Sequence, residues 1–333
     1  MSITTVKTRC PAKVNLTFQI VGLLSDGYHE VKTLMQSVSL EDELTFRFAE
    51  GNGKVTFASV DSTFAASFPA DESNLIVKAI RKFQHTIPDS NTKDIEIEIV
   101  KNIPIGAGLA GGSANAAAAL AAMNHQFDKA LSTKELTAIG SSLGADVPFC
   151  LTGGTAIGTH KGDVLTRITS ASILHLLLVK PQQLSISTPW AFKEFDKLVL
   201  HERIAGRTID DTTDECASLV HRGTPTEIAS HLVNDLEHPV FHHYAELNNI
   251  REKLEQFGAL KARLTGSGPT LYGLFDCENG AIEAKTRLDD FQAKQARNDP
   301  SGFASETTPR PRKHIYPLDS WVVTTSRHGA RVV

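Results

Sequence analysis

Apolar and polar residues alternate along much of the first 100 residues, a pattern typical of β-strands with one buried face. The predicted strands cover residues 8–21, 32–40, 43–48, 53–60 and 94–100. Glu41 and Asp42 are expected to end the second strand, and the next two strands are expected to form a hairpin or meander. The last strand, DIEIEIV, alternates most strictly. The pattern therefore predicts an antiparallel sheet with one face in solvent.

Helical periodicity follows in three segments. Residues 74–83 place apolar side chains on one helix face, and Asp71, Glu72 and Ser73 precede them as expected caps. The alanine-rich residues 115–123 predict a second helix, because alanine has the highest helix propensity. A capping box of Ser132 and Glu135 predicts a third, ending near Leu143.

The second half of the chain mixes strands and helices. The predicted elements are a strand at 173–179, a strand and proline-set turn at 184–192, helices within 193–235, a helix at 241–256 and a small-residue loop between two strands at 262–275. From Gln292 to Pro317 the composition changes to Asn, Pro, Ser, Arg and Lys without periodicity, which predicts a flexible insertion. A last strand is expected near 321–323.

Composition narrows the class of protein. A length of 333 residues predicts two domains, and 41% hydrophobic with 22% charged residues is ordinary for a globular protein. The formal net charge of −4 gives no reason to expect nucleic acid or an anionic membrane as a partner. No apolar run approaches 18 residues. A monomer or homodimer is expected.

Cysteine usage and the start of the chain bear on location. The four cysteines are scattered without a CxxC pair, which is typical of reduced thiols. The first residues contain no secretory apolar core, and the segment around Lys13 leaves no room for a transit peptide. We therefore expect a cytoplasmic protein.

The most distinctive stretch is a glycine-rich loop that opens the alanine-rich helix. Four glycines lie between Gly106 and Gly112, and Ser113 follows. Glycine permits close approach of the backbone, and a helix N-terminus offers unpaired N–H groups to an anion. This pattern predicts a phosphate site; a loop that merely allows close helix packing is the alternative.

Two better-known nucleotide motifs do not fit this loop. Its glycines spell GxGxxG, but a dinucleotide site needs a fully buried parallel strand before the loop, and the DIEIEIV strand alternates. Asp128 has the spacing of the acidic residue in that motif, yet it follows a helix. No Gly-Lys-Ser/Thr follows the loop, so it is not a Walker A motif.

Several polar residues stand out, each with a structural alternative. Lys13 and Asn15 share one strand face, which in isolation favours a solvated surface. Tyr28 and His29 lie in a turn-rich loop, and Asp146 lies between a helix stop and an apolar segment, where it could be a cap. The loop at 265–268 is a hairpin turn on its own, but together with the first loop it could close over a polyphosphate.

Three segments together resemble a known superfamily. The order PAKVNL, IPIGAGLAGGSANAAAAL and LTGSGPTLYGLF is similar to the three signatures of the galactokinase, homoserine kinase, mevalonate kinase and phosphomevalonate kinase (GHMP) superfamily. LGADVPFCLTGGTAIGTHKGD, STPWAF and NDLEHPVF resemble the branch that acts on a cytidine diphosphate-linked methylerythritol in the non-mevalonate isoprenoid pathway. These segments span most of residues 9–276, and the tail beyond about 290 departs from the pattern.

The resemblance implies an α+β fold of two domains. The first, residues 1–160, would be a ribosomal-protein-S5-like domain with an antiparallel sheet and helices that binds ATP. The second, residues 161–290, would be a ferredoxin-like α/β sandwich. Residues 291–333 are not covered by the resemblance; from their composition we expect a tail with the flexible insertion at 292–317 and a last strand near 321–323.

The resemblance also implies site residues. Lys13 and Asp146 would be catalytic, and ATP with Mg²⁺ would be required, with Ser113 as a metal ligand. The expected ATP and phosphate residues are Asn74, Lys101, Pro104, Ile105, Gly106, Ala107, Gly108, Leu109, Ala110, Gly111, Gly112, Ser113 and Ala114. The expected acceptor residues are Asn15, Tyr28, His29, Thr188 and Phe192, and the third motif contributes Gly266, Ser267 and Gly268.

The implied activity is ATP-dependent phosphorylation of the C2 hydroxyl of 4-diphosphocytidyl-methylerythritol. A mevalonate or homoserine kinase is the first alternative, but neither substrate offers a ring for Tyr28, His29 and the STPWAF segment. A catalytically silent nucleotide-binding relative is the second, and the presence of both Lys13 and Asp146 argues against it. A NAD-binding domain is the third.

Overall fold

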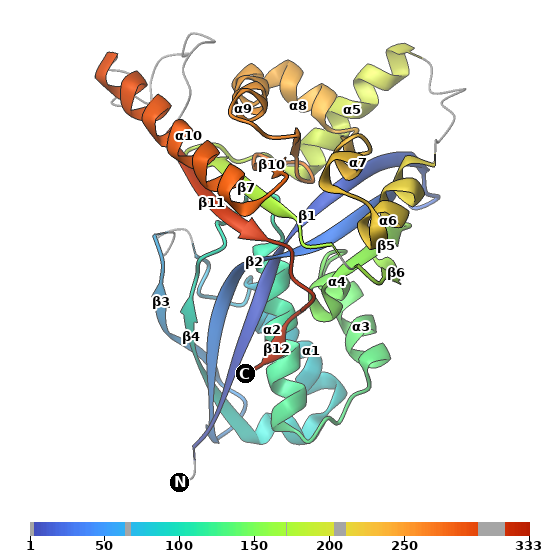
Figure 1. Cartoon of the computed structure of the whole chain (residues 1–333). Helices are drawn as coiled ribbons and strands as arrows, with labels where there is room; N and C mark the ends of the chain where they lie inside the picture. Colours follow the sequence, from blue (N-terminus) through green and yellow to red (C-terminus); the bar gives the residue numbers. More distant parts are fainter. Residues whose placement is uncertain (1–2, 64–67, 171, 203–210, 299–316) are drawn as a thin grey trace.

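The computed structural model describes residues 3–63, 68–170, 172–202, 211–298 and 317–333. Within this part of the chain the strands form two sheets (Figure 1). The first comprises β1 (Thr4–Leu23), β2 (His29–Glu50), β3 (Val55–Asp61), β4 (Lys93–Val100), β5 (Thr155–Thr159), β6 (Val164–Ile168), β8 (Val233–Asn234) and β12 (Arg331–Val332). The second comprises β7 (His175–Pro181), β9 (Lys261–Leu264), β10 (Leu271–Phe275) and β11 (Leu318–Thr324).

Helices accompany both sheets. With the first sheet are α1 (Leu75–Thr86), the 3₁₀ helix η2 (Pro88–Thr92), α2 (Gly111–Gln126), α3 (Thr133–Ser141) and α4 (Val147–Thr152). The remaining helices follow later in the chain. They are α5 (Thr188–Glu202), α6 (Thr212–Arg222), α7 (Pro225–Ala229), α8 (Glu237–His243), α9 (Ala245–Gln256) and α10 (Glu278–Asn298). The predicted α+β class is confirmed by these elements.

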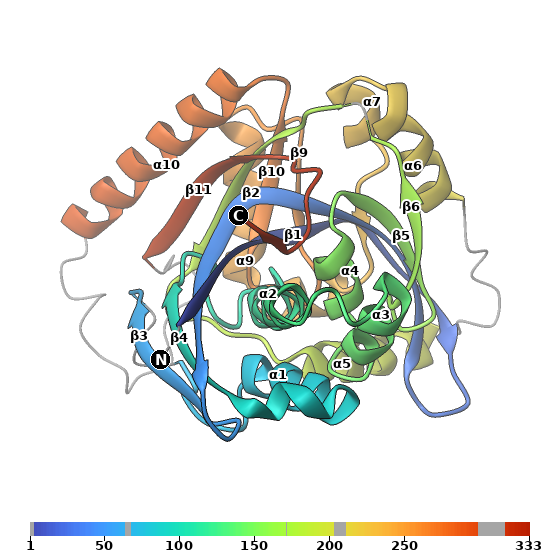
Figure 2. The same ribbon diagram turned by 90° about the horizontal axis from the view of Figure 1, so that it is seen from below.

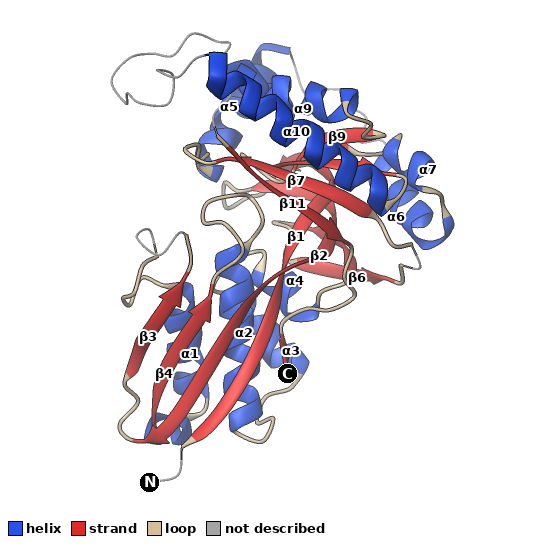
Figure 3. Cartoon of the chain, turned by 60° about the vertical axis from the view of Figure 1, so that its left-hand side comes forward, coloured by secondary structure: helices blue, strands red, loops and turns tan. Residues whose placement is uncertain are grey.

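The first sheet is organised around the long antiparallel pair β1 and β2, of 20 and 22 residues. Its order is β12-β1-β2-β4-β3, with β5 on β2, and α1 and α2 lie on one face (Figure 3). The predicted hairpin is wrong, because β4 lies between β2 and β3 and pairs in parallel with β3. The sheet is thus mainly, but not wholly, antiparallel.

The predicted strand end at Glu41 and Asp42 is also wrong, since β2 runs through both residues. Asp42 is fully buried, and its carboxylate accepts hydrogen bonds from the backbone N–H groups of Asn102 and Ile103. It also pairs with the buried Lys101 ammonium. These long-range partners satisfy a charge that would otherwise be costly inside a strand.

Helix α2 lies at the centre of the first half, enclosed by β1, α1 and α4 (Figure 2). Its alanines from Ala116 to Ala119 are completely buried, so the small side chains allow neighbouring elements to approach closely. The predicted helix 115–123 lies within it. The predicted cap of α1 shifts by one residue, because the Asn74 side chain accepts from the Ile76 N–H. The capping box at Ser132 is confirmed.

The second sheet has the order β11-β7-β10-β9, and every neighbouring pair is antiparallel. Numbered along the chain this is 4-1-3-2, with helices between the first and second and between the third and fourth strands. Helices α9 and α10 pack against it, and α10 crosses β7 and β11 (Figure 3). This is the predicted ferredoxin-like arrangement.

Three predictions for the second half need correction. Residues 184–192 do not form a strand and turn: α5 begins at Thr188 with Pro189 in its first turn, where the missing N–H costs nothing. The helix expected at 241–256 is two helices, α8 and α9, which meet at Tyr244. Helix α10 continues to Asn298, so the first part of the expected insertion at 292–317 is helical. Residues 299–316 lie outside the described residues.

The two sheets meet where the β9–β10 loop contacts β1. The Asn15 N–H donates to Thr265 Oγ1, and the Tyr272 hydroxyl donates to the Leu16 carbonyl. These bonds join residues about 250 positions apart in the chain. The contact brings the third signature segment onto the strand that carries Lys13.

Candidate active site

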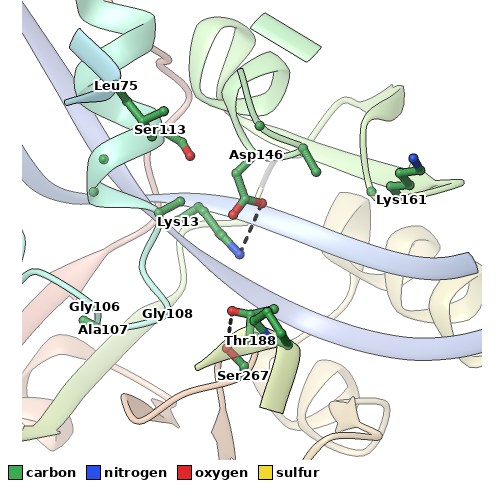
Figure 4. A pocket seen from close by; sticks show the side chains of 18 of the residues that line it. Lys13, Leu75, Gly106, Ala107, Gly108, Ser113, Asp146, Lys161, Thr188 and Ser267 are labelled. Carbon is green, nitrogen blue, oxygen red and sulfur yellow. Dashed lines mark hydrogen bonds and ion pairs between the residues drawn. The ribbon is translucent and has the colours of Figure 1, made fainter. Parts of the chain in front are cut away.

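A cavity of about 1050 Å³ lies between the two halves of the chain, and almost all the predicted site residues line it (Figure 4). The lining includes Lys13, Asn15, Tyr28, His29, Asn74, Lys101, Pro104, Ile105, Gly106, Ala107, Gly108, Gly111, Gly112, Ser113, Asp146, Thr188, Phe192, Gly266 and Ser267, and also Ala110. Of the predicted residues, Leu109, Ala114 and Gly268 do not line it. Segments scattered along the chain thus meet at one cavity, and the roles of their residues stay predictions.

Lys13 is a buried lysine with only 4% of its surface exposed, so the solvated-face alternative is wrong. Its Nζ donates to Asn15 Oδ1 at 2.8 Å and lies 3.5 Å from Asp146 Oδ1 (Figure 4). Its backbone N–H bonds the Leu109 carbonyl, which ties β1 to the glycine-rich loop. The ammonium is thus held at a fixed place in the cavity wall.

Asp146 occupies the N-cap position of α4, but its side chain makes no capping hydrogen bond. The cap alternative therefore does not describe it. The carboxylate is 38% exposed and faces the Lys13 ammonium across the cavity (Figure 4). A carboxylate in this position can accept a proton from a hydroxyl group that binds beside it.

Asn15 accepts a hydrogen bond from the Lys13 ammonium and so helps to position it. While its Oδ1 accepts from Lys13, its Nδ2 donates to Thr33 Oγ1 at 2.8 Å. Only 2% of Asn15 is exposed. Its side chain is thus committed to protein partners that orient the ammonium, and the predicted contact with acceptor hydroxyls stays a prediction.

The glycine-rich loop leads directly into the N-terminus of the 16-residue helix α2. Ala110, the N-cap residue, has a left-handed conformation (φ 57°) and makes no side-chain cap bond. Gly111, Gly112 and Ser113 line the cavity in the first turn, where N–H groups and the positive end of the helix dipole attract anions. The arrangement suits a phosphate chain.

Gly108 is where the two small-residue loops touch. Its φ is +76°, and a Cβ atom there would lie 2.7 Å from the Thr265 carbonyl oxygen and 2.9 Å from that of Gly268. Both are backbone atoms of the third motif, so relieving either contact would require the backbone of that loop to move. Only glycine fits at this position.

We expect Gly108→Ala to raise KM for ATP at least tenfold and to destabilise the fold by about 1–3 kcal/mol, the usual cost of forced backbone strain. ATP kinetics and urea unfolding measure the two effects. Gly280→Ala in α10 is the control, because a Cβ there meets neighbours only at ordinary contact distances. Wild-type ATP kinetics in Gly108→Ala would contradict the assigned loop contact.

The third motif is held in place by Asn234, which the sequence analysis did not name as a site residue, and by the predicted residue Thr188. Asn234 donates from Nδ2 to the carbonyls of Leu264 and Gly266, both at 2.8 Å. Ser267 Oγ and Thr188 Oγ1 lie 2.9 Å apart, which links the loop to the start of α5 (Figure 4). The NDLE segment was visible in the sequence, but its partners 30 residues later were not.

Two residues expected on the acceptor side contact each other. Phe192 stacks on His29, with ring centroids 4.6 Å apart and an interplanar angle of 22°. The His29 Nε2 atom lies 2.7 Å from Asp196 Oδ1. One face of the Phe192 ring is therefore covered by His29, and the stacking of a base on Tyr28 and Phe192 stays a prediction.

Tyr28 is also partnered. The Lys161 Nζ atom lies 3.9 Å from the Tyr28 ring centroid and forms an ion pair with Asp26 at 2.6 Å. The hydrogen bond with Asp26 raises the pKa of Lys161 and lowers the pKa of Asp26. Lys161 and Asp196 line the cavity, and sequence reasoning missed both.

On the opposite side of the cavity, Asn74 and Lys101 have their polar groups occupied. Asn74 caps α1 and donates to the Pro69 carbonyl, and Lys101 pairs with Asp42 with 3% of its side chain exposed. They shape this wall of the cavity rather than offer free donors. Their place near the nucleotide stays a prediction.

Three buried cysteines, Cys10, Cys150 and Cys216, do not line the cavity. Burial raises the pKa of the Cys150 thiol far above its ordinary value, and the Asp146 charge raises it further. Burial likewise raises the pKa of Cys10, and it raises the pKa of Cys216 to about 12. These thiols stay protonated and inert near neutral pH.

This fold and site define the class of the GHMP kinases. The family model described as "GHMP kinases N terminal domain" matches residues 74–154, and "GHMP kinases C terminal" matches residues 216–294. A protein of Gloeobacter violaceus named 4-diphosphocytidyl-2-C-methyl-D-erythritol kinase is 38% identical over 271 residues, covering 81% of this chain and 85% of its own. The chain belongs to the 4-diphosphocytidyl-2-C-methyl-D-erythritol kinase family.

Solved structures agree with this assignment. A crystal structure of 4-(cytidine 5'-diphospho)-2C-methyl-D-erythritol kinase aligns with a TM-score of 0.70 and 25% identity, covering 96% of this chain and 98% of that one. A homoserine kinase of Cytophaga hutchinsonii aligns with a TM-score of 0.69 at 19% identity, covering 99% of this chain and 97% of that one, which shows the shared fold alone. The predicted family and fold are confirmed, and so is the prediction that the protein is an ATP-dependent small-molecule kinase. None of the helices in the described residues is long and apolar enough to cross a bilayer.

Proposed function

We propose that the chain transfers the γ-phosphoryl group of ATP to the C2 hydroxyl of 4-diphosphocytidyl-2-C-methyl-D-erythritol, giving the 2-phosphate and ADP in the non-mevalonate isoprenoid pathway. The observation that carries the proposal is the Lys13–Asp146 pair, 3.5 Å apart in the cavity that also receives the N-terminus of α2. The names of the related kinases support the identity of the acceptor.

Each residue then has a defined task. The first-turn N–H groups of α2 hold the phosphates of ATP, and the Lys13 ammonium stabilises negative charge that develops during transfer. Asn15 holds that ammonium in position. Asp146 accepts the proton of the acceptor hydroxyl while the hydroxyl oxygen forms a bond to the γ-phosphorus of ATP. At the same time the bond between that phosphorus and the departing ADP oxygen breaks.

We assign the acceptor base to the end of the cavity lined by Tyr28, His29 and Phe192. These side chains supply flat surfaces and one ring nitrogen able to form a hydrogen bond. Thr188, at the start of α5, is next to this end of the cavity and contacts Ser267. Neither mevalonate nor homoserine has a ring that would use these side chains.

The residues present suit Mg²⁺ held mainly by nucleotide phosphates. Within the described residues no group of three or more His, Cys, Asp or Glu side chains could hold a metal ion by itself. Ser113 and Asp146 both line the cavity and offer oxygen ligands. When bound, Mg²⁺ would supply charge neutralisation on the phosphates.

A cytoplasmic location is part of the proposal. All four cysteines are free, and three of them are buried. Reduced thiols are typical of proteins kept in a reducing compartment.

We expect Phe192→Ala to raise KM for the cytidine acceptor at least tenfold and to leave KM for ATP within about twofold, because the lost aromatic surface contributes about 1–3 kcal/mol. Steady-state kinetics with each substrate varied in turn measure the difference. Phe291→Ala in α10, which also removes a partly buried aromatic ring, is the control. An equal loss for both substrates would place Phe192 outside the acceptor site.

The proposal is tested by ³¹P NMR of the reaction mixture. Incubation with ATP, Mg²⁺ and the cytidine acceptor should yield ADP and one new phosphomonoester signal, while the acceptor's diphosphate signals persist. A product with a lengthened polyphosphate chain would place the transfer elsewhere. ATP binding without any turnover would favour the silent nucleotide-binding relative.

A further inference from the structure

The imidazole of His29 is held in a fixed orientation by three side chains of α5. Phe192 stacks on one face, Phe195 meets the ring edge-on with centroids 6.5 Å apart, and Asp196 Oδ1 lies 2.7 Å from Nε2. The side chain of His29 is only 14% exposed. Such an arrangement leaves the ring little freedom to rotate.

Asp196 also constrains which nitrogen carries the proton. A carboxylate can only accept, so the short contact requires Nε2 to be the N–H donor. In the neutral imidazole Nδ1 is then an acceptor. Among the described residues, no hydrogen bond to Nδ1 is present, so this lone pair is the ring's remaining polar group in a cavity-lining residue.

An acceptor at this place distinguishes two pyrimidines. Cytosine carries an amino group at C4, which donates, whereas uracil carries a carbonyl, which only accepts. The Nδ1 lone pair of an imidazole can therefore accept a hydrogen bond from the amino group of cytosine, whereas it is repelled by the carbonyl oxygen of uracil. A site built to bond a polar group discriminates strongly against a ligand that leaves it unpaired.

We propose that Asp196 is a positioning residue that makes the site specific for cytosine over uracil, by fixing the His29 tautomer whose Nδ1 accepts from the cytosine amino group. This inference rests on the proposed function, since it presumes that the base binds beside His29. Asp196 itself need not touch the base.

The test compares the affinities of CDP and UDP for the wild type and for Asp196→Asn. An asparagine side chain can present either its oxygen or its amino group to Nε2, so the tautomer is no longer fixed. We expect the wild type to bind CDP at least tenfold more tightly than UDP, and Asp196→Asn to lose most of that preference. KM for ATP should stay within about twofold.

Two further variants separate positioning from general damage. Glu194→Gln removes one carboxylate from the same helix at a residue that pairs with Lys197 and does not line the cavity, so the CDP preference should persist. Asp196→Glu keeps the carboxylate and should restore part of the preference. A loss of preference in Glu194→Gln equal to that in Asp196→Asn would overturn the proposal.

The tautomer can be observed directly by ¹⁵N NMR of histidine-labelled protein, with the His29 signals identified from a His29→Gln variant. The wild type should show a protonated Nε2 and an unprotonated Nδ1 at about pH 8, and Asp196→Asn a mixture. A doubly protonated ring, or an unchanged CDP preference in Asp196→Asn, would overturn the role of Asp196. Equal binding of CDP and UDP by the wild type with the tautomer as expected would instead count against the cytidine acceptor itself.

Discussion

Replacing Asp146 with asparagine is expected to lower kcat by about 10²–10⁴-fold, the usual contribution of a positioned base, while ATP still binds. The asparagine keeps the size of the side chain but loses the ability to take a proton. Since Asp146 makes no capping bond, the fold should tolerate the change. Single-turnover kinetics and an ATP binding isotherm measure the two quantities.

A matched control is available at the start of α6. Asp211 also occupies an N-cap position without a side-chain cap bond, and it does not line the cavity. Asp211→Asn should therefore retain wild-type kcat. If Asp146→Asn were nearly as active as Asp211→Asn, Asp146 would be neither base nor orienting group.

Lys13→Met is expected to lower kcat by about 10²–10³-fold, the typical effect of removing one preorganised charge-stabilising donor. Methionine fills a similar space, so the burial of β1 should be kept. Lys7→Met is the control, because Lys7 lies on the same strand and is exposed. An unfolding midpoint near the wild-type value would separate lost chemistry from lost structure.

The two substitutions should not be additive. Groups that act as one unit in a reaction lose most of their effect when either is removed. Asp146→Asn in a Lys13→Met background should therefore cost much less than it does alone. Full multiplication of the two effects would mean that the residues, although 3.5 Å apart, act independently.

The phosphate side of the site could be predicted from sequence because it is encoded locally. Glycine spacing, the alanine run and the capping residues each specify backbone over a few positions. Lys13 became a candidate through the first of the three signatures and Asp146 through the LGADVPFC segment, and the structure brings them together. Neither periodicity nor composition alone would have separated Lys13 from a solvated strand lysine.

The remaining features of the fold and site depend on contacts between residues that are far apart in the sequence. β2 continues through Asp42 because Lys101, some 60 residues later, neutralises it. His29 meets Asp196 across 167 positions, and Asn234 finds its partners in the third motif. Local patterns carry no information on such pairs. The start of α5 was missed for another reason: a proline within a short apolar run favours a turn unless it occupies the first turn of a helix.

The most direct test of the central claim is ADP release with ATP and Mg²⁺, measured in parallel for 4-diphosphocytidyl-2-C-methyl-D-erythritol, mevalonate and homoserine. The account predicts turnover with the cytidine compound and none above background with the other two, and loss of that turnover in Asp146→Asn. Turnover with mevalonate or homoserine instead would keep the fold and the phosphate site but contradict the acceptor assigned to Tyr28, His29 and Phe192.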